Sequence, residues 1–192
     1  MKAAHTALEI ARYLLWRVAR ERPDDPDYLT PLKLQKLLYY VQGWHLVEAQ
    51  TPAFDDEIQA WRDGPVVVAV YREFRSLGKG PILSAPQTPP ELVAPTRAVV
   101  ESVWSRYKDY SAFKLSDMTH DEMPWTKSRA GLPPSAQSDA PIPLADIADE
   151  FAGQLARAQA RVRAHAGAIR AAAKERSWRG PTAATDGASG NQ

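Results

Sequence analysis

The chain has 192 residues, of which 44% are hydrophobic and 24% charged, and it contains no cysteine. This length suffices for one compact domain with appendages. The lack of cysteine excludes disulfides, zinc–thiolate sites and thiol nucleophiles. No apolar run approaches the roughly 18 to 20 residues that cross a bilayer, and no secretory signal opens the chain. We therefore expect a cytoplasmic protein without membrane association.

Charge is unevenly distributed, although the net charge is only +1. Residues 1–156 carry 17 Lys/Arg and 21 Asp/Glu, whereas residues 157–192 carry 7 and 2. An acidic body is thus followed by a basic segment. Such a segment is typical of a solvated helix face or, less commonly, of a nucleic-acid contact. Its candidate tether or phosphate-contact residues are Arg157, Arg161, Arg163 and Arg170.

Two helices are predicted in the first quarter of the chain. Apolar residues recur at helical spacing over residues 7–18, behind Thr6 as an N-cap. Thr30 and Pro31 form a second start signal, because proline has no N–H to leave unpaired in a first turn. Residues 34–44 supply the apolar stripe of that second helix.

The next segment combines strand and helix signals. Residues 57–61 alternate weakly, so a short strand is one open option there. The Gly64 and Pro65 pair is interpreted as another helix start, followed by an apolar stripe over residues 66–77. Residues 78–95 are rich in proline and glycine and predict a connection.

Helical signals dominate the remainder. A helix is predicted over residues 96–107, Ser111 caps a short one, and Pro124 opens a single turn that carries Trp125. From Pro143 onward, apolar residues advance by three or four, which predicts one long Ala/Arg-rich helix. The expected fold class is mainly α: a compact multi-helix domain with at most a short β-hairpin, plus a long C-terminal helix.

These patterns divide the chain into three parts. Residues 1–156 form the predicted domain, and residues 157–179 form a basic helical extension. Residues 180–192 lack apolar content and are predicted to be disordered.

No arrangement of residues predicts catalysis. The four histidines, His5, His45, His120 and His165, include no pair at metal-ligand spacing on one helix face. His120, Asp121 and Glu122 come nearest to a site, but adjacent polar residues at a helix end are more often a cap and a solvated turn. Gly78 and Gly80 lack the Lys-Ser/Thr of a phosphate loop. We therefore predict no catalytic residue, no cofactor and no metal, and hence no enzyme.

The tryptophans could either anchor a partner or pack in the core. A tryptophan at a rim can anchor a partner. The positions that lie within or beside apolar stripes are instead expected in the core: Trp44, Trp61, Trp104 and Trp125.

Three strings in this order support a family resemblance: LTPLKLQKLLYYVQGWHL, EIQAWRDGPVVVAVYREF and LSDMTHDEMPWTKSR. Together they resemble the Panacea domain, the SocA-like or GepA-like family of antitoxins often found near phage genes. The resemblance covers roughly residues 6–155. It implies a mostly helical protein that neutralises a toxin by direct binding. The SocA-type member also implies an adaptor that hands its toxin to the ClpXP protease.

The family pattern carries over to particular positions but implies no catalytic residue. As signature and candidate partner-binding residues it gives Gln35, Lys36, Tyr40, Trp61, Gly64, Pro65, Tyr71, His120, Pro124 and Trp125. Gln35, Lys36 and Tyr40 fall off the apolar stripe, so they either bind a neighbouring loop or face a partner. We favour a buried hydrogen bond from Gln35 or Tyr40 to the Gly64 or His120 turn.

The working hypothesis is an antitoxin that binds a cognate protein toxin and either masks it or presents it to ClpXP. The basic helix and tail would then serve as a tether to the ClpX component. The alternative is a DNA-binding regulator that uses one arginine face of the C-terminal helix on phosphates. The acidic body opposes nucleic-acid binding, so we rank this alternative second. The sequence leaves the oligomeric state open.

Overall fold

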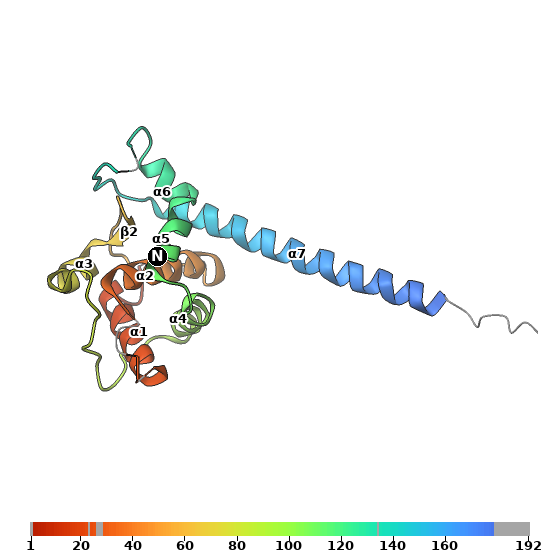
Figure 1. Cartoon of the computed structure of the whole chain (residues 1–192), viewed down its shortest axis with the longest axis horizontal. Helices are drawn as coiled ribbons and strands as arrows, with labels where there is room; N and C mark the ends of the chain where they lie inside the picture. The colour runs from red at the N-terminus through yellow and green to blue at the C-terminus, as the bar shows by residue number, and fades with distance from the viewer. Residues whose placement is uncertain (1, 23, 26–28, 134, 179–192) are drawn as a thin grey trace, which may run out of the picture. The chain divides into compact units, whose positions relative to one another are not determined.

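Helix α2 (Pro31–Glu48) lies at the centre of the packing. The computed structural model describes residues 2–22, 24–25, 29–133 and 135–178. Within them, α2 contacts α1, α3, α4, α5 and β2 (Figure 1). Every α2 residue from Lys33 to His45 is buried, including those off the predicted apolar stripe. This helix is therefore enclosed on all sides, and its polar residues must find partners inside the protein.

Both predicted N-terminal helix starts are confirmed. Helix α1 (Ala7–Glu21) follows Thr6, whose hydroxyl accepts the Glu9 N–H at 3.2 Å. The Glu9 carboxylate in turn accepts the Thr6 N–H at 2.8 Å, which completes a capping box. Helix α2 follows Thr30, which caps it with Pro31 in the first turn.

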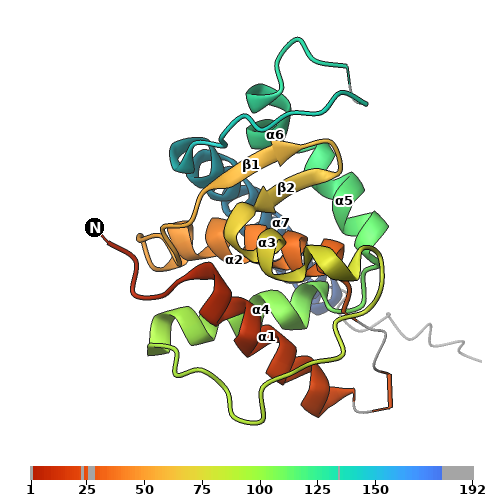
Figure 2. The ribbon, with the colours of Figure 1, turned by 90° about the vertical axis from the view of Figure 1, so that its left-hand side faces the viewer.

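A β-hairpin replaces the helix start predicted at Gly64 (Figure 2). Strands β1 (Ile58–Trp61) and β2 (Gly64–Val67) are antiparallel, and Trp61 pairs with Gly64 around a two-residue turn. The strand considered for residues 57–61 is thus confirmed. The prediction of a helix beginning at Gly64 and Pro65 is wrong, because helix α3 begins only at Val68 and ends at Phe74.

The hairpin explains why glycine and proline stand at its second strand. Gly64 has a φ of +102°, which glycine adopts without the steric cost of a Cβ. Pro65 pairs with Ala60, whose N–H points away from the hairpin to the Ala140 carbonyl at 2.8 Å. The ladder needs no N–H from residue 65, so proline is tolerated there. The two valines that follow favour the extended backbone.

The remaining predicted helices are present, although α4 begins two residues before the predicted residue 96. A short 3₁₀ turn follows α3, and the elements beyond it are α4 (Ala94–Tyr107), α5 (Ala112–His120), α6 (Met123–Ser128) and α7 (Leu144–Trp178). The Ser111 hydroxyl caps α5 by accepting the Lys114 N–H at 3.1 Å, and Pro124 lies in the first turn of α6. These helix predictions are confirmed.

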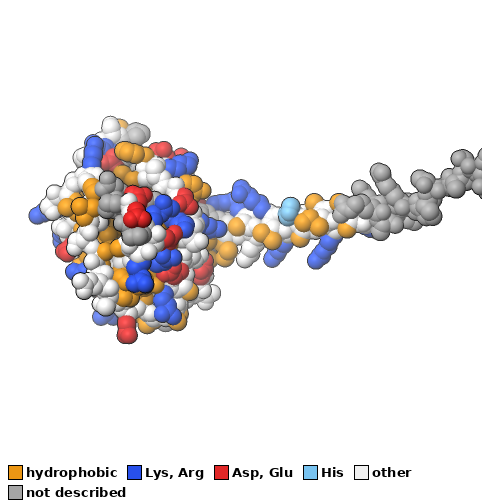
Figure 3. All heavy atoms as spheres, turned by 60° about the horizontal axis from the view of Figure 1, so that its bottom comes forward, with side chains coloured by type: hydrophobic (Ala, Val, Ile, Leu, Met, Phe, Trp, Pro, Cys, Tyr) orange, Lys and Arg blue, Asp and Glu red, His pale blue; other side chains and the backbone are white. Residues whose placement is uncertain are grey.

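The described residues fall into two units that divide between Ala152 and Gly153. The first unit contains the core, including Phe151 of α7. Beyond Gly153, α7 exposes apolar and basic side chains (Figure 3). The mainly α fold class is confirmed, with one short hairpin and a long C-terminal helix among the described residues. The tail predicted for residues 180–192 lies outside the described residues. No helix among the described residues is long and apolar enough to span a bilayer.

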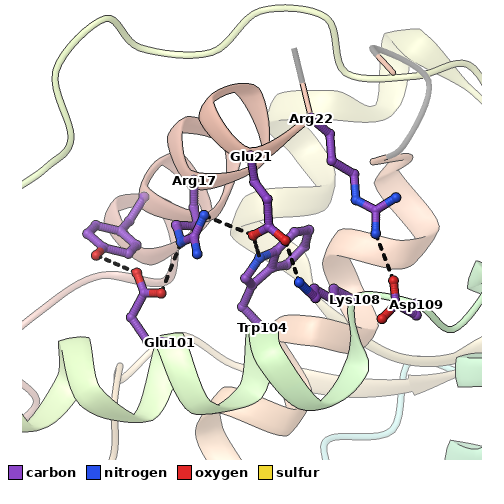
Figure 4. Close-up of polar contacts among 8 residues, drawn as sticks. Arg17, Glu21, Arg22, Glu101, Trp104, Lys108 and Asp109 are labelled. Carbon is purple, nitrogen blue, oxygen red and sulfur yellow. Dashed lines mark hydrogen bonds and ion pairs between the residues drawn. The ribbon is translucent and has the colours of Figure 1, made fainter. Parts of the chain in front are cut away.

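Helices α1 and α4 are joined by charged side chains, which we call the α1–α4 seam (Figure 4). Glu21 lies at its centre and accepts the Trp104 indole N–H at 2.6 Å. The same carboxylate pairs with Arg17 at 2.9 Å and with Lys108. Arg17 pairs also with Glu101 at 3.0 Å. The seam therefore joins two helices by contacts between side chains.

Candidate functional site

The backbone of the β-hairpin is held by five side chains from three helices and the turn that follows α6. Figure 2 shows α2, α5 and α6 around β1 and β2. The side chains that hydrogen-bond hairpin backbone atoms, which we call the hairpin clamp, are Gln35, Lys36, Ser116, Trp125 and Arg129. All five are buried. The clamp fixes the hairpin relative to the helices, since each broken bond would leave a polar group without a partner.

Two clamp residues come from α2 and hold strand β2. The Gln35 side-chain carbonyl accepts the Val67 N–H at 2.7 Å, and its amide donates to the Val67 carbonyl at 3.4 Å. The Lys36 ammonium donates to the Pro65 carbonyl at 3.2 Å. These two residues therefore satisfy three backbone groups of a strand that has no sheet neighbour on that side.

Two further clamp residues hold the turn. The Ser116 hydroxyl of α5 donates to the Asp63 carbonyl at 2.7 Å. The Trp125 indole of α6 donates to the Trp61 carbonyl at 2.8 Å. These two bonds hold the backbone carbonyls of Trp61 and Asp63, on either side of Arg62. The Arg62 and Asp63 side chains form an exposed ion pair at 3.2 Å.

Arg129 joins the hairpin to the segment before α7. Its guanidinium donates to the Ala60 carbonyl at 3.0 Å and to the Pro133 and Ala136 carbonyls at 3.1 and 2.7 Å. It also lies over the Trp125 ring, 4.9 Å from its centroid. A buried arginine is here satisfied by three backbone carbonyls, so its role in this part of the chain is to hold segments together.

Lys36 and Gly64 are packed against each other. A Cβ at residue 64 would lie 2.3 Å from Lys36 Nζ and 2.7 Å from Thr119 Oγ1. Burial lowers the pKa of Lys36 to about 7, although nearby Asp63 acts in the opposite direction. Glycine is thus required at residue 64 for both its backbone angle and the space that the ammonium occupies.

The outer side of the hairpin carries an aromatic pair. Trp61 and Tyr71 meet edge to face with ring centroids 4.5 Å apart. Trp61 is only partly buried and Tyr71 is exposed. The prediction that Trp61 belongs to the core is therefore wrong; at the end of β1 its indole donates to the Gln59 side chain at 2.7 Å. Trp44, Trp104 and Trp125 are buried, as predicted.

A groove runs along this side, formed by two adjoining hollows of about 210 and 360 Å³. We call it the hairpin groove; both hollows are lined by Leu32, Arg62, Asp63, Gly78 and Lys79. Trp61 and Tyr71 line the first hollow, and Phe113 lines the second.

Phe113 is 74% exposed, although it is a large apolar residue. Exposed aromatic side chains beside a polar rim of both signs are typical of protein-binding surfaces. The chemistry of the hairpin groove therefore suits a protein partner.

Tyr40 makes a buried hydrogen bond to the turn that follows His120, as the favoured hypothesis predicted. Its ring stacks on Tyr107 at 4.2 Å, and its hydroxyl donates to the Glu122 carboxylate at 3.4 Å. The favoured hypothesis placed these bonds at the Gly64 or His120 turn. Gln35 binds Val67 instead of Gly64, and Tyr40 binds Glu122, two residues beyond His120.

His120 lies beside the clamp and packs against Trp125. Its ring stacks on Trp125 at 4.2 Å, and burial together with the nearby Lys36 charge lowers its pKa. Pro124, which precedes this tryptophan, is buried in the first turn of α6. No group of three or more potential metal ligands occurs among the described residues. The described surroundings of His120 are those of a packing residue.

The four arginines of α7 do not form the single face that phosphate binding would need. At 100° per residue, Arg157 and Arg161 lie about 150° around the helix from Arg163 and Arg170. All four are exposed. The expectation of one arginine face is therefore wrong, because a regular helix separates the two pairs.

Sequence reasoning missed most of the groove. Leu32, Lys79 and Phe113 come from three segments that only the fold brings together. One local signal was available: Asp63 followed by Gly64 is typical of hairpin connections, and here Asp63 ends the turn and Gly64 begins β2. Phe113 was a second signal of an exposed site, because it is aromatic but falls off the apolar stripe of α5.

Residues 34–126 match the family model described as "Antitoxin SocA-like, Panacea domain". This segment, 93 of the 192 residues, is similar to the SocA-like Panacea domain. A curated relative, Antitoxin SocA of Caulobacter vibrioides (strain NA1000 / CB15N), is 42% identical over 50 residues. That match covers 26% of this chain and about a quarter of the relative, 27% of its length. No solved structure matches. The matched Panacea segment contains the hairpin and four of the five clamp residues, all but Arg129.

Proposed function

We propose that this protein is an antitoxin that binds a protein toxin at the hairpin groove. The observation that carries the proposal is the match of residues 34–126 to the SocA-like antitoxin family. Most signature residues in that segment are buried and position the hairpin. The groove beside the hairpin supplies the exposed side chains that a partner would contact.

Physical considerations favour this groove for binding. Neutralising a toxin needs anchoring contacts that exclude water, and aromatic side chains near the centre of an interface supply most such energy. Phe113, Tyr71 and Trp61 are aromatic, accessible and adjacent to the groove. The clamp holds the groove's hairpin wall in one position, which limits the ordering cost on binding.

Co-expression with the product of the neighbouring reading frame tests the proposal. The native chain should rescue growth, and purified complex should show direct binding by calorimetry. Phe113→Ala should weaken binding at least roughly tenfold. Leu83→Ala is a matched control, because Leu83 is similarly exposed, at 68%, and lines neither hollow of the groove.

Two results would contradict the proposal at different levels. Failure of the native chain to rescue growth from any candidate toxin would argue against the antitoxin function. Rescue with equal binding by the Phe113 and Leu83 variants would retain the antitoxin function and place the interface elsewhere.

We also propose delivery of the bound toxin to ClpXP, which the SocA-type resemblance implies. A chain truncated after Arg157 should bind toxin normally but leave its half-life unchanged in cells with ClpXP. Full-length chain should shorten that half-life only when the protease is present. A stable toxin under both conditions would instead mean neutralisation by masking.

The DNA-binding alternative loses support from the separated arginine pairs. Binding to duplex DNA with a steep loss of affinity as salt rises would restore it. Because a duplex can contact only one side of α7, substituting the arginine pair on that side should then account for most of the loss of affinity.

A further inference from the structure

The exposed part of α7 carries a regular apolar stripe. Leu155, Val162 and Ile169 are spaced by seven residues, and Val162 and Ile169 are 69% and 54% exposed. Smaller residues lie between them at Ala158, Ala166 and Ala173. At 100° per residue, all six fall within about 80° of the helix circumference. Leu155, Val162 and Ile169, with Ala166 and Ala173, keep the seven-residue repeat of a coiled-coil seam, and Ala158 lies at its edge. Alanine in such a seam allows close approach of a second helix.

Basic side chains flank this stripe on both sides. Arg163, Arg170 and Lys174 lie on one side, and Arg161 lies on the other; Arg157 lies nearer the opposite face of the helix. Residues 153–174 contain no Asp or Glu. On the face seen in Figure 3, orange and blue side chains follow the described part of this helix beyond residue 153 without red ones.

We propose that this face of α7 binds an amphipathic helix of another protein whose apolar stripe is flanked by acidic residues. In a two-stranded coiled coil, side chains that flank the seam meet those of the opposite helix, and opposite charges set the choice of partner. Cations on both flanks of α7 therefore select a partner with carboxylates on both flanks. The apolar stripe then becomes buried between the two helices.

The same charges disfavour the other occupants of this face. A second copy of α7 would bring arginine against arginine on either flank, which is unfavourable in both helix directions. Nucleic acid would contact the arginines of one flank only and leave Val162 and Ile169 exposed to water. An acidic amphipathic helix satisfies both flanks and the stripe together. The inference does not rest on the antitoxin function, because it concerns a surface outside the hairpin groove.

The test uses full-length protein and a fluorescein-labelled designed peptide of about four heptads, with leucine and isoleucine in its seam and glutamate on both flanks. A peptide with lysine in place of each glutamate is the charge control. We expect saturable binding of the glutamate peptide, a rise in helicity on mixing, and no binding of the lysine peptide.

Substitutions distinguish a docked helix from simple charge attraction. Val162→Ser with Ile169→Ser should weaken binding at least roughly tenfold, because the seam loses its two exposed large residues. Ala164→Ser with Ala171→Ser is the matched control, since these residues lie opposite the stripe, and it should change affinity less than about twofold. Far-UV circular dichroism should show all variants equally helical.

Several outcomes would overturn the proposal. Equal binding of both peptides, no binding of either, or an unchanged affinity in the Val162 and Ile169 variant would each do so. Concentration-dependent dimerisation through α7 without peptide would instead assign the face to a second copy. Tighter binding to a DNA duplex or to anionic phosphatidylserine vesicles than to the glutamate peptide would assign it to those ligands.

Discussion

The hairpin clamp and the α1–α4 seam both join distant segments by polar side chains, yet they differ in burial and in what they bond. The clamp consists of buried side chains that bond backbone atoms of β1 and β2. The seam consists of charged pairs at the surface, and even its central carboxylate, Glu21, is 22% exposed. One region fixes a strand position, and the other joins two helices that already pack through their apolar faces.

This difference has energetic and functional consequences. Losing one partner of a buried hydrogen bond costs about 1–3 kcal/mol, because the remaining group stays desolvated. Exposed ion pairs contribute only about 0–1 kcal/mol. Three clamp residues, Gln35, Lys36 and Trp125, are signature positions that the resemblance implied. The clamp therefore fixes the hairpin wall of the hairpin groove, whereas the seam adds modest stability. Substitutions in the two regions should therefore differ in their effect on stability, with the largest loss expected in the clamp.

Gly64→Ala should be the most damaging single substitution in the clamp. It combines a φ of +102° with contacts of 2.3 and 2.7 Å to buried atoms of Lys36 and Thr119. We expect a loss of roughly 3 kcal/mol or more in the free energy of unfolding. Gly131→Ala is the control, because it has a φ of +82° with nothing within 4 Å of a Cβ. Equal losses in denaturant melts would show that the packing against Lys36 is unimportant.

Gln35→Ala should separate site geometry from overall stability. It leaves the Val67 N–H and carbonyl without their partner, with an expected loss of roughly 2–4 kcal/mol. Gln42 is a natural match, since it bonds the Ala53 N–H at 2.9 Å and the Phe54 carbonyl at 3.0 Å away from the groove. Both alanine variants should lose similar stability. Only Gln35→Ala should weaken toxin binding by the folded protein; equal weakening would contradict the role of the clamp.

Lys36 should make stability rise with pH. Its folded pKa of about 7 lies below the ordinary value of 10.5, so the unfolded chain binds more protons between these values. The free energy of unfolding should therefore increase from pH 7 to 9.5, by up to about 1.4 kcal/mol per pH unit. Above about pH 10 the trend reverses, because burial raises the pKa of Tyr40 and disfavours its ionisation in the folded state.

Lys36→Met removes that contribution while keeping a long side chain. Some slope should remain, because burial also lowers the pKa of Lys33, to about 8. Chemical denaturation at several pH values measures the slope for each variant. An identical slope in the native chain and Lys36→Met would mean that this ammonium titrates as it does in water.

Local signals made the helices predictable from the sequence. Thr6, Thr30 and Ser111 cap the helices that they were expected to start, because a cap involves only the next three residues. Gly64 and Pro65 were misleading, since the same pair fits a helix start and a hairpin. The outcome depends on Gln35 and Ala140, which lie far away in the sequence but adjacent in the fold.

The candidate site was predictable only in its buried part. The family signature identified Gln35 and Trp125, whose function in this structure is to hold the hairpin. The groove itself was not predicted, because Leu32, Lys79 and Phe113 meet only after the chain has folded. Sequence patterns predict buried positions and helix caps well, because both depend on nearby residues. An exposed surface formed by three separate segments has no periodic pattern in the sequence that would reveal it.

Glu21→Gln, in the seam, should have a smaller effect than any substitution in the clamp. Bonds from Lys108 and Trp104 lower the pKa of Glu21 to about 2, from an ordinary value of 4.5. Its stabilisation is therefore present above pH 4.5 and is lost as pH falls toward 2. At neutral pH we expect the variant to lose about 1 kcal/mol or less, and less still at high salt. The outlying Glu73→Gln, whose pair with Arg12 spans 3.7 Å, should have no measurable effect. A loss as large as that of Gln35→Ala, insensitive to salt, would show that the seam positions structure as strongly as the clamp.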